Sequence, residues 1–157
     1  MKNFVHLINL IIYFSFILFL NFKVSAIDTK AEQAIVMDYD TNEVLFEKNS
    51  NMKVPPASMT KIMTVFVAFD RIKNTNLSIT QKCRISPTAY KMGGSRTFLE
   101  IDDYVTIDDL LRGIIIQSGN DASIALAECL AGTEKDFAKL MNVYAKKLKL
   151  SNTNFLN

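Results

Sequence analysis

Residues 54–66 read VPPASMTKIMTVF, and a single charged residue, Lys61, stands in this otherwise uncharged stretch. The Pro-Pro pair ends any preceding strand, and the residues after it predict a helix over about 58–72. Ser58 lies three positions before Lys61, so both side chains share one face of that helix. Between residues 62 and 69 only one residue is polar. This pattern predicts a helix that is buried on most of its sides.

The position of Lys61 at the start of a core helix suggests a chemical role. Burial disfavours the charged form of an amine, so we expect the pKa of Lys61 to be lowered. A neutral amine beside the Ser58 hydroxyl would be a general base beside a nucleophile. In the alternative, the Lys61 ammonium reaches solvent and Ser58 only caps the helix. An isolated S-x-x-K pattern recurs by chance, so taken alone it favours this alternative.

A second polar group interrupts an apolar segment further along the chain. Ser118-Gly119-Asn120 separates LLRGIIIQ from the apolar run ASIALAECLA. Unpaired polar groups in apolar surroundings cost about 1–3 kcal/mol, so these side chains need partners. The alternative is an ordinary turn in which Asn120 caps the following helix.

The remaining pattern predicts an α+β fold, with a β-hairpin followed by a block of helices. Residues 34–37 and 44–47 are β-rich runs joined by a turn that contains Asp-Thr-Asn. Residues 74–105 are rich in turn signals. Within them KMGGSRTF, residues 91–98, suggests an ordered loop near a site, but an ordinary surface loop is favoured.

Capping signals define the helices of the second half. Thr106 is expected to cap the helix IDDLLRGIII, and Gly132 to end the helix that follows Asn120. Thr133 and Asp136 resemble a capping box. Five residues recur at helical spacing after this box and are expected in the core: Phe137, Leu140, Met141, Tyr144 and Leu148.

The N-terminus carries an export signal. An apolar run over residues 7–20 follows Lys2, and Val-Ser-Ala at residues 24–26 offers the small residues of a cleavage site. We expect residues 1–26 to form a signal peptide that is cleaved after Ala26. An uncleaved membrane anchor is the alternative, because the run is near the lower length limit for a spanning helix. Either way, the rest of the chain is exported.

Composition limits the function of residues 27–157, which can form one domain or part of one. They contain 16 basic and 16 acidic residues, so no basic excess argues for a nucleic-acid partner. The only histidine is His6, which excludes a Ser-His-Asp triad and the common imidazole zinc sites from the exported part. No cofactor or metal is expected. Cys83 and Cys129 could form one disulfide, but the Ala-rich surroundings of Cys129 favour a buried free thiol.

The two polar motifs, in this order, resemble those of the active-site serine penicillin-binding proteins and β-lactamases, whose signature is S-x-x-K, S-x-N and K-T-G. The segments PPASMTKIMT, GGSRTFLE, LLRGIIIQSGNDASIALAE and LKLSNTNF resemble the N-terminal half of the D-alanyl-D-alanine carboxypeptidases. The likeness covers about residues 33–157. It implies a β-lactamase/transpeptidase-like fold, an antiparallel sheet plus a helical subdomain, truncated here before most of the sheet. Residues 27–157 would be the N-terminal part of that catalytic domain.

The resemblance also implies roles for individual residues. Ser58 would be the acylated nucleophile and Lys61 the base that takes its proton. Ser118 would exchange protons with the lysine, and Asn120 would hold the lysine and the substrate amide. The activity implied is removal of the terminal D-alanine from peptidoglycan stem pentapeptides, with β-lactams as inhibitors, in the periplasm or at the outer face of the cytoplasmic membrane.

One departure from the family pattern concerns the third motif. No Lys-Thr-Gly or Lys-Ser-Gly occurs in the 157 residues. In the family that motif binds the substrate carboxylate and supplies one oxyanion donor. The alternatives are therefore an inactive truncated fragment or, with less support, a β-lactamase with a deacylating carboxylate.

Overall fold

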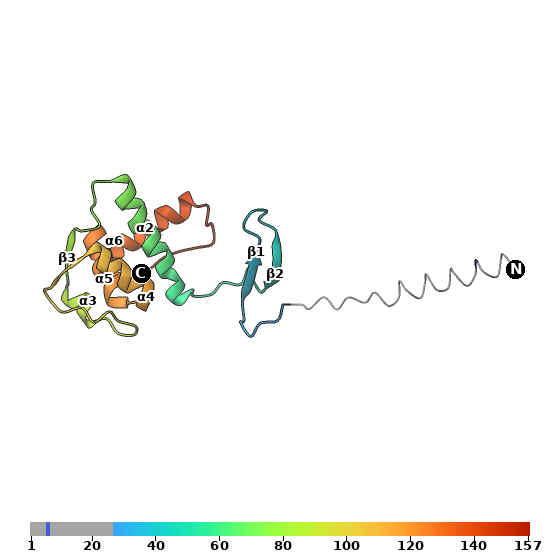
Figure 1. Cartoon of the computed structure of the whole chain (residues 1–157), viewed down its shortest axis with the longest axis horizontal. Helices are drawn as coiled ribbons and strands as arrows, with labels where there is room; N and C mark the ends of the chain where they lie inside the picture. The colour runs from blue at the N-terminus through green and yellow to red at the C-terminus, as the bar shows by residue number, and fades with distance from the viewer. Residues whose placement is uncertain (1–5, 7–26) are drawn as a thin grey trace. The chain divides into compact units, whose positions relative to one another are not determined.

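The computed structural model describes His6 and residues 27–157 (Figure 1). The predicted signal peptide or anchor thus lies almost wholly outside the described residues. Within the described part, no helix has the length and apolar character needed to span a membrane. The chain divides into two compact units between Val54 and Pro55.

The first unit contains the predicted hairpin. Strands β1 (Ala34–Met37) and β2 (Val44–Lys48) pair in antiparallel fashion, with a register shift after Val36. Asp38 fixes the turn, because its carboxylate accepts hydrogen bonds from the backbone N–H groups of Asp40 and Thr41 at 3.1 and 2.8 Å. The expected hairpin is therefore confirmed.

The second unit is mostly helical (Figure 1). Its helices are η1 (Ala57–Met59), α2 (Thr60–Asn74), α3 (Pro87–Lys91), α4 (Ile107–Gln117), α5 (Asn120–Ala131) and α6 (Glu134–Lys147). A second antiparallel pair joins β3 (Lys82–Arg84) to β4 (Tyr104–Thr106). Helix α5 contacts α2, α3, α4, α6 and β3. Asn120, the first residue of α5, is thus carried on the central element of this unit.

Local capping explains where α4 and α6 begin. The hydroxyl oxygen of Thr106 accepts a hydrogen bond from the backbone N–H of Asp109 at 3.1 Å. Thr133 does the same for Asp136 at 3.0 Å. Gly132 adopts a positive φ of 85° after α5, where a side chain would be strained. These three capping predictions are confirmed.

The predicted burial of α2 is only half right. Met63, Thr64, Val67 and Ala68 are buried. Ile62, however, is 72% exposed and Phe69 is 47% exposed. The helix packs one face on α4, α5 and α6, and no element of the described residues covers the other. An apolar sequence indicates that a helix can be buried on several sides, but its actual burial depends on which other elements pack against it.

The apolar stripe of α6 is mostly in the core. Phe137, Met141 and Tyr144 are buried, and Leu140 packs against the core from a partly buried position. Leu148 is 46% exposed and does not belong to the core, contrary to the prediction. The helix ends at Lys147, so Leu148 leaves the helical face that the spacing assumed.

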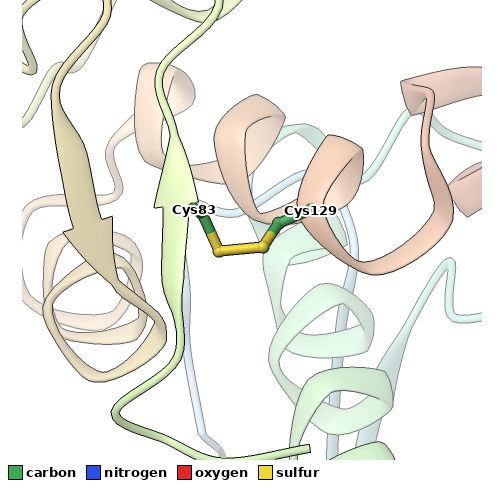
Figure 2. The surroundings of a disulfide bond; sticks show 2 residues. All are labelled: Cys83 and Cys129. Atoms are coloured by element: carbon green, nitrogen blue, oxygen red, sulfur yellow. A yellow bond between two sulfur atoms is a disulfide. The ribbon is translucent and has the colours of Figure 1, made fainter.

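The expectation of free thiols is wrong. Cys83 and Cys129 form a disulfide with a Cα–Cα distance of 5.5 Å (Figure 2). Cys83 is the central residue of β3, and this strand packs against α5, which carries Cys129. Cys129 is only partly buried, and its partner comes from a strand 46 residues earlier, which the apolar sequence around Cys129 could not indicate.

Candidate active site

Ser58 and Lys61 lie together at the start of α2, as their spacing predicts. Ser58 is in the short helix η1, and the Nζ of Lys61 donates to its Oγ at 3.5 Å. Neither η1 nor α2 has a side-chain cap hydrogen bond at its N-terminus. The alternative in which Ser58 serves only as a helix cap is therefore wrong. The Ser58 side chain is exposed, so its hydroxyl is accessible.

Two positions in the site have a left-handed backbone conformation. Ala57, immediately before Ser58, has φ 49°, and Ser118 has φ 54° at the end of α4. Residues with a β-carbon rarely adopt this conformation, because it brings the β-carbon close to the backbone. Strain of this kind concentrates at functional sites, where the surrounding structure over-determines it. Each motif thus includes or adjoins a backbone position of the kind that occurs at functional sites.

Asn120 connects the second motif to the first. Its Oδ1 accepts a hydrogen bond from Lys61 Nζ at 2.7 Å, and its Nδ2 donates to the carbonyl oxygen of Gly93 at 2.8 Å. The residue that caps α5 is Gly119, and no side chain makes a cap hydrogen bond there. The alternative role of Asn120 as a cap is thus wrong. Its side chain is committed at both ends to partners distant in sequence.

Burial lowers the pKa of Lys61, as the sequence predicts. The side chain is partly buried, and within the described residues it makes no salt bridge with a carboxylate. An amine in such a place is desolvated without a compensating negative charge, so its neutral form is favoured relative to a free lysine. A neutral amine can accept the proton of a neighbouring hydroxyl.

Ser118 contributes a hydroxyl that has no fixed partner. Its Oγ is buried and makes no hydrogen bond to any described residue. It lines a cavity of about 350 Å³ together with Ser58 and Lys61. The other lining residues are apolar: Ile62, Val65, Ile114 and Ile115. A polar cluster with one unused hydroxyl thus faces an apolar cavity, which is the usual composition of a small-molecule site.

A second cavity, of about 440 Å³, lies on the α5 and α6 side of the same pair. Ser58, Lys61 and Asn120 line it, together with Pro55 and Phe137 among others. Ser58 and Lys61 are the two residues that line both cavities. The nucleophile candidate is therefore open to a ligand from two directions.

The loop of residues 93–99 is part of this site, although the sequence favoured an ordinary surface loop. Besides the bond from Asn120 to Gly93, the backbone N–H of Asn120 donates to the carbonyl oxygen of Ser95 at 2.7 Å. A β-carbon on Gly94 would lie 2.7 Å from Asn120 Nδ2, so a glycine lets the loop approach this closely. The Gly-Gly pair was the signal in the sequence that could have indicated this contact.

Sequence reasoning also missed Asp121. This carboxylate is fully buried and accepts hydrogen bonds from the backbone of residues 97–99. The signal was available, since an aspartate in an otherwise apolar helix must find partners when it is buried.

Comparison with known proteins agrees with this geometry. The sequence model of the D-alanyl-D-alanine carboxypeptidase family matches residues 21–157 of this chain. The D-alanyl-D-alanine carboxypeptidase DacF of Bacillus subtilis is 44% identical over 135 residues, which are 86% of this chain and 35% of the relative.

Solved structures show the same relationship. The D-alanyl-D-alanine carboxypeptidase DacD from Francisella tularensis superposes with a TM-score of 0.79 at 40% identity, over 83% of this chain and 32% of that protein. Penicillin-binding protein 5 from Haemophilus influenzae gives a TM-score of 0.79 at 35% identity, over 84% of this chain and 39% of that protein. These neighbours confirm the expected α+β, transpeptidase-like fold.

The chain spans about a third of the length of the curated relatives it matches. Within that third, the match includes both polar motifs and nearly all of the described residues. The chain belongs to the D-alanyl-D-alanine carboxypeptidase family.

Proposed function

We propose that this chain provides the nucleophile, the base and one wall of the active site in a serine-type D-alanyl-D-alanine carboxypeptidase. The substrate is the stem pentapeptide of peptidoglycan, from which the enzyme removes the terminal D-alanine. β-Lactams would inhibit it by acylating the same serine. No metal or cofactor takes part in the proposed reaction.

One observation carries this proposal. A single amine, Lys61 Nζ, lies within hydrogen-bonding distance of both Ser58 and Asn120, although Asn120 is 59 residues away in sequence. The fold thus brings together two motifs, each of which would be weak evidence alone. The matching relatives are D-alanyl-D-alanine carboxypeptidases, which supports the reaction class.

The proposed reaction has two steps. In the first, neutral Lys61 takes the Ser58 proton while Ser58 Oγ forms a bond to the carbonyl carbon of the penultimate D-alanine. The amide C–N bond breaks, and the proton passes to the leaving amine of the terminal D-alanine. In the second, water attacks the ester, its proton goes to Lys61, and Ser58 recovers a proton as the shortened peptide leaves.

Ser118 and Asn120 would assist these proton transfers. The unpaired Ser118 hydroxyl faces the same cavity as Lys61 and can pass a proton between the lysine and the leaving group. Asn120 would orient the lysine through Oδ1, and it would also hold the substrate amide with the second hydrogen of Nδ2, since only one hydrogen is needed for the bond to Gly93. The backbone N–H of Ser58 would contribute half of an oxyanion hole.

Acylation by a labelled β-lactam tests the proposal. The test protein joins this chain to the Lys-Thr-Gly region of a relative, because no such motif occurs in the 157 residues. We expect one label per protein, located by mass spectrometry on Ser58. Ser58→Ala should abolish the label, whereas Ser151→Ala, a matched change at an exposed serine, should leave it intact. Undiminished labelling of the Ser58→Ala protein would contradict the proposal.

The 157-residue chain alone is expected to be labelled weakly or not at all. It holds only one of the two expected oxyanion donors and no motif for the substrate carboxylate. Rapid labelling of this chain would show that the third motif is dispensable.

The site of action follows from the substrate. We propose that the protein is exported and acts in the periplasm or at the outer face of the cytoplasmic membrane. Cleavage after Ala26 predicts Ile27 as the first residue of the exported form. N-terminal sequencing that finds residues 1–26 still attached would instead indicate a membrane anchor.

A further inference from the structure

Asp121 is the only charged side chain that is buried among the described residues, and it is fully inaccessible to solvent. Its position is the first turn of α5, directly after Asn120. Burying a carboxylate is unfavourable unless hydrogen bonds replace its hydration. The partners that Asp121 has found therefore indicate what it does.

Those partners are mostly backbone N–H groups of the loop 93–99. Thr97 N donates to Oδ1 and Oδ2 at 2.8 and 3.0 Å, and Leu99 N donates to Oδ2 at 3.3 Å. Ala122 N donates to Oδ1 at 2.9 Å. The guanidinium of Arg96 lies 3.8 Å from Oδ2. Burial alone would raise the pKa of Asp121, but these backbone hydrogen bonds outweigh it and lower the pKa, so the group stays ionised.

The carboxylate thus fastens the loop to the N-terminal end of α5. Thr97 packs closely against Gly113 and Gly119. A β-carbon on Gly113 would lie 2.6 Å from Thr97 Oγ1, and a β-carbon on Gly119 would overlap this oxygen. The same stretch of loop presents its carbonyl groups to Asn120. Ser95 O accepts from Asn120 N at 2.7 Å, and Gly93 O accepts from Asn120 Nδ2 at 2.8 Å.

The bond to Gly93 determines which way the Asn120 carboxamide faces. A carboxamide has a donor end and an acceptor end, and the acceptor end receives an N–H of Lys61, which leaves the lone pair of the neutral amine free to take the Ser58 proton. Because Gly93 O takes the donor end, Oδ1 is turned toward Lys61 Nζ. Without that carbonyl the amide could rotate and place its NH₂ group beside the lysine.

We propose that Asp121 is a positioning residue: by holding residues 97–99 it keeps the Gly93 carbonyl in place, and so keeps the Asn120 oxygen on Lys61. The inference rests on the proposed function, in which Lys61 is the base. It extends the site from the two motifs to a buried carboxylate that touches neither the substrate nor the reacting atoms.

Asp121→Asn is the sharpest test, because the change keeps the shape of the side chain. Oδ1 serves Thr97 and Ala122, whereas Oδ2 serves Thr97 and Leu99. In either orientation the new NH₂ group therefore faces a backbone N–H and leaves it without an acceptor. Asp109→Asn is the matched control, since Asp109 is also in the first turn of a helix but is exposed and bonds to Thr106 rather than to the loop.

Two readouts of amide exchange in this chain do not depend on activity. The first is exchange of the backbone amides in residues 97–99. The second is exchange of the Asn120 side-chain amide, assigned in ¹⁵N-asparagine spectra by its loss in Asn120→Ala. We expect Asp121→Asn to accelerate both by about tenfold or more, and Asp109→Asn to change neither by more than about twofold.

Acylation of Ser58 in the protein joined to the third motif is the third readout. We expect Asp121→Asn to slow it by about ten- to hundredfold, because the base would no longer be held in one geometry. Far-ultraviolet circular dichroism checks folding of each variant. Where Asp121→Asn does not fold, Arg96→Ala carries the test, since it loosens the loop from a partly exposed position and leaves the carboxylate in place.

The outcomes distinguish failure of the positioning role of Asp121 from failure of the proposed function. Faster exchange of both the loop and the Asn120 side chain supports the positioning role. Faster exchange of the loop with an unchanged Asn120 side chain overturns it, because Asp121 would then serve the loop alone. Unchanged exchange at both places overturns it as well. If Ser58 is not acylated even with Asp121 intact, the proposed function fails, and the exchange results still decide the role of Asp121.

Discussion

Lys61 Nζ lies 2.7 Å from Asn120 Oδ1, and this contact joins the first turn of α2 to the first turn of α5. The same amine lies 3.5 Å from Ser58 Oγ. Among the residues that the structure describes, Lys61 is therefore the side chain that links the two motifs. Its substitution should separate the contribution of a positioned base from that of the rest of the site.

Lys61→Ala should slow acylation of Ser58 by a labelled β-lactam by about 10²–10⁴-fold in the protein joined to the third motif, because a positioned general base contributes about that much. Lys61→Arg should do little better, since a guanidinium stays protonated and cannot accept the serine proton. Lys73→Ala is the control, because Lys73 is an exposed lysine in the last turn of the same helix. An unchanged rate in Lys61→Ala would contradict the assignment of the base.

The rate of acylation should rise with pH and reach half its maximum below the ordinary pKa of lysine, because burial lowers the pKa of Lys61. The free energy of unfolding should also rise as the pH increases between the folded and unfolded pKa values of this group. In that pH range the unfolded chain holds the Lys61 proton and the folded chain has released it, so raising the pH favours the folded state. A stopped-flow pH profile tests the first expectation. An inflection that persists in Lys61→Ala would assign the titration to another group.

Ser118→Ala should weaken acylation without destabilising the fold. The buried Ser118 hydroxyl has no hydrogen-bond partner in the described part of the chain, so removing it relieves a desolvation cost. We expect the free energy of unfolding to stay constant or rise by about 1 kcal/mol, while acylation slows by about 10²-fold. Urea denaturation and β-lactam labelling measure the two effects. A parallel loss of stability and rate would point to a structural role for this hydroxyl.

Removing the disulfide should destabilise the helical unit by about 2–4 kcal/mol, because the bond closes a long loop between residues 83 and 129. The double variant Cys83→Ala/Cys129→Ala should unfold at a lower urea concentration than the oxidised protein. A reducing agent should lower the midpoint of the original protein and leave that of the double variant unchanged. Equal midpoints for oxidised and reduced protein would show that the bond adds no stability.

The exposed apolar face of α2 should make the chain associate in solution. Ile62, Phe66 and Phe69 are all more than 40% exposed on successive turns of the same helix. Exposed apolar patches promote association, so light scattering should detect oligomers that decrease in Ile62→Lys. Lys73→Ala again serves as the control. A monodisperse monomer with a sharp cooperative unfolding transition would contradict this expectation.

Features set by neighbouring residues could be predicted from the sequence. The caps at Thr106 and Thr133 and the hairpin turn after Asp38 each depend on side chains that bond within a few residues. The pair of Ser58 and Lys61 was predictable for the same reason, because helical geometry fixes a spacing of three.

Features set by distant residues could not be predicted in this way. The disulfide, the loop at Gly93 and the burial of Asp121 all depend on segments that meet only in the folded chain. The open face of α2 was missed because an apolar pattern does not say which neighbours are present.

The disulfide encloses one of the two motifs in a covalent ring and leaves the other outside it. The bond between Cys83 and Cys129 closes a ring that contains Ser118 and Asn120 together with the loop that orients them. Ser58 and Lys61 lie outside this ring. In the oxidised unfolded chain, the disulfide restricts how far Ser118, Asn120 and the loop can separate. Ser58 and Lys61 are linked to this ring only through the flexible chain before Cys83, so their separation from it is less restricted. The contact between Lys61 and Asn120 therefore forms when α2 docks against a segment that the disulfide has already closed into a ring.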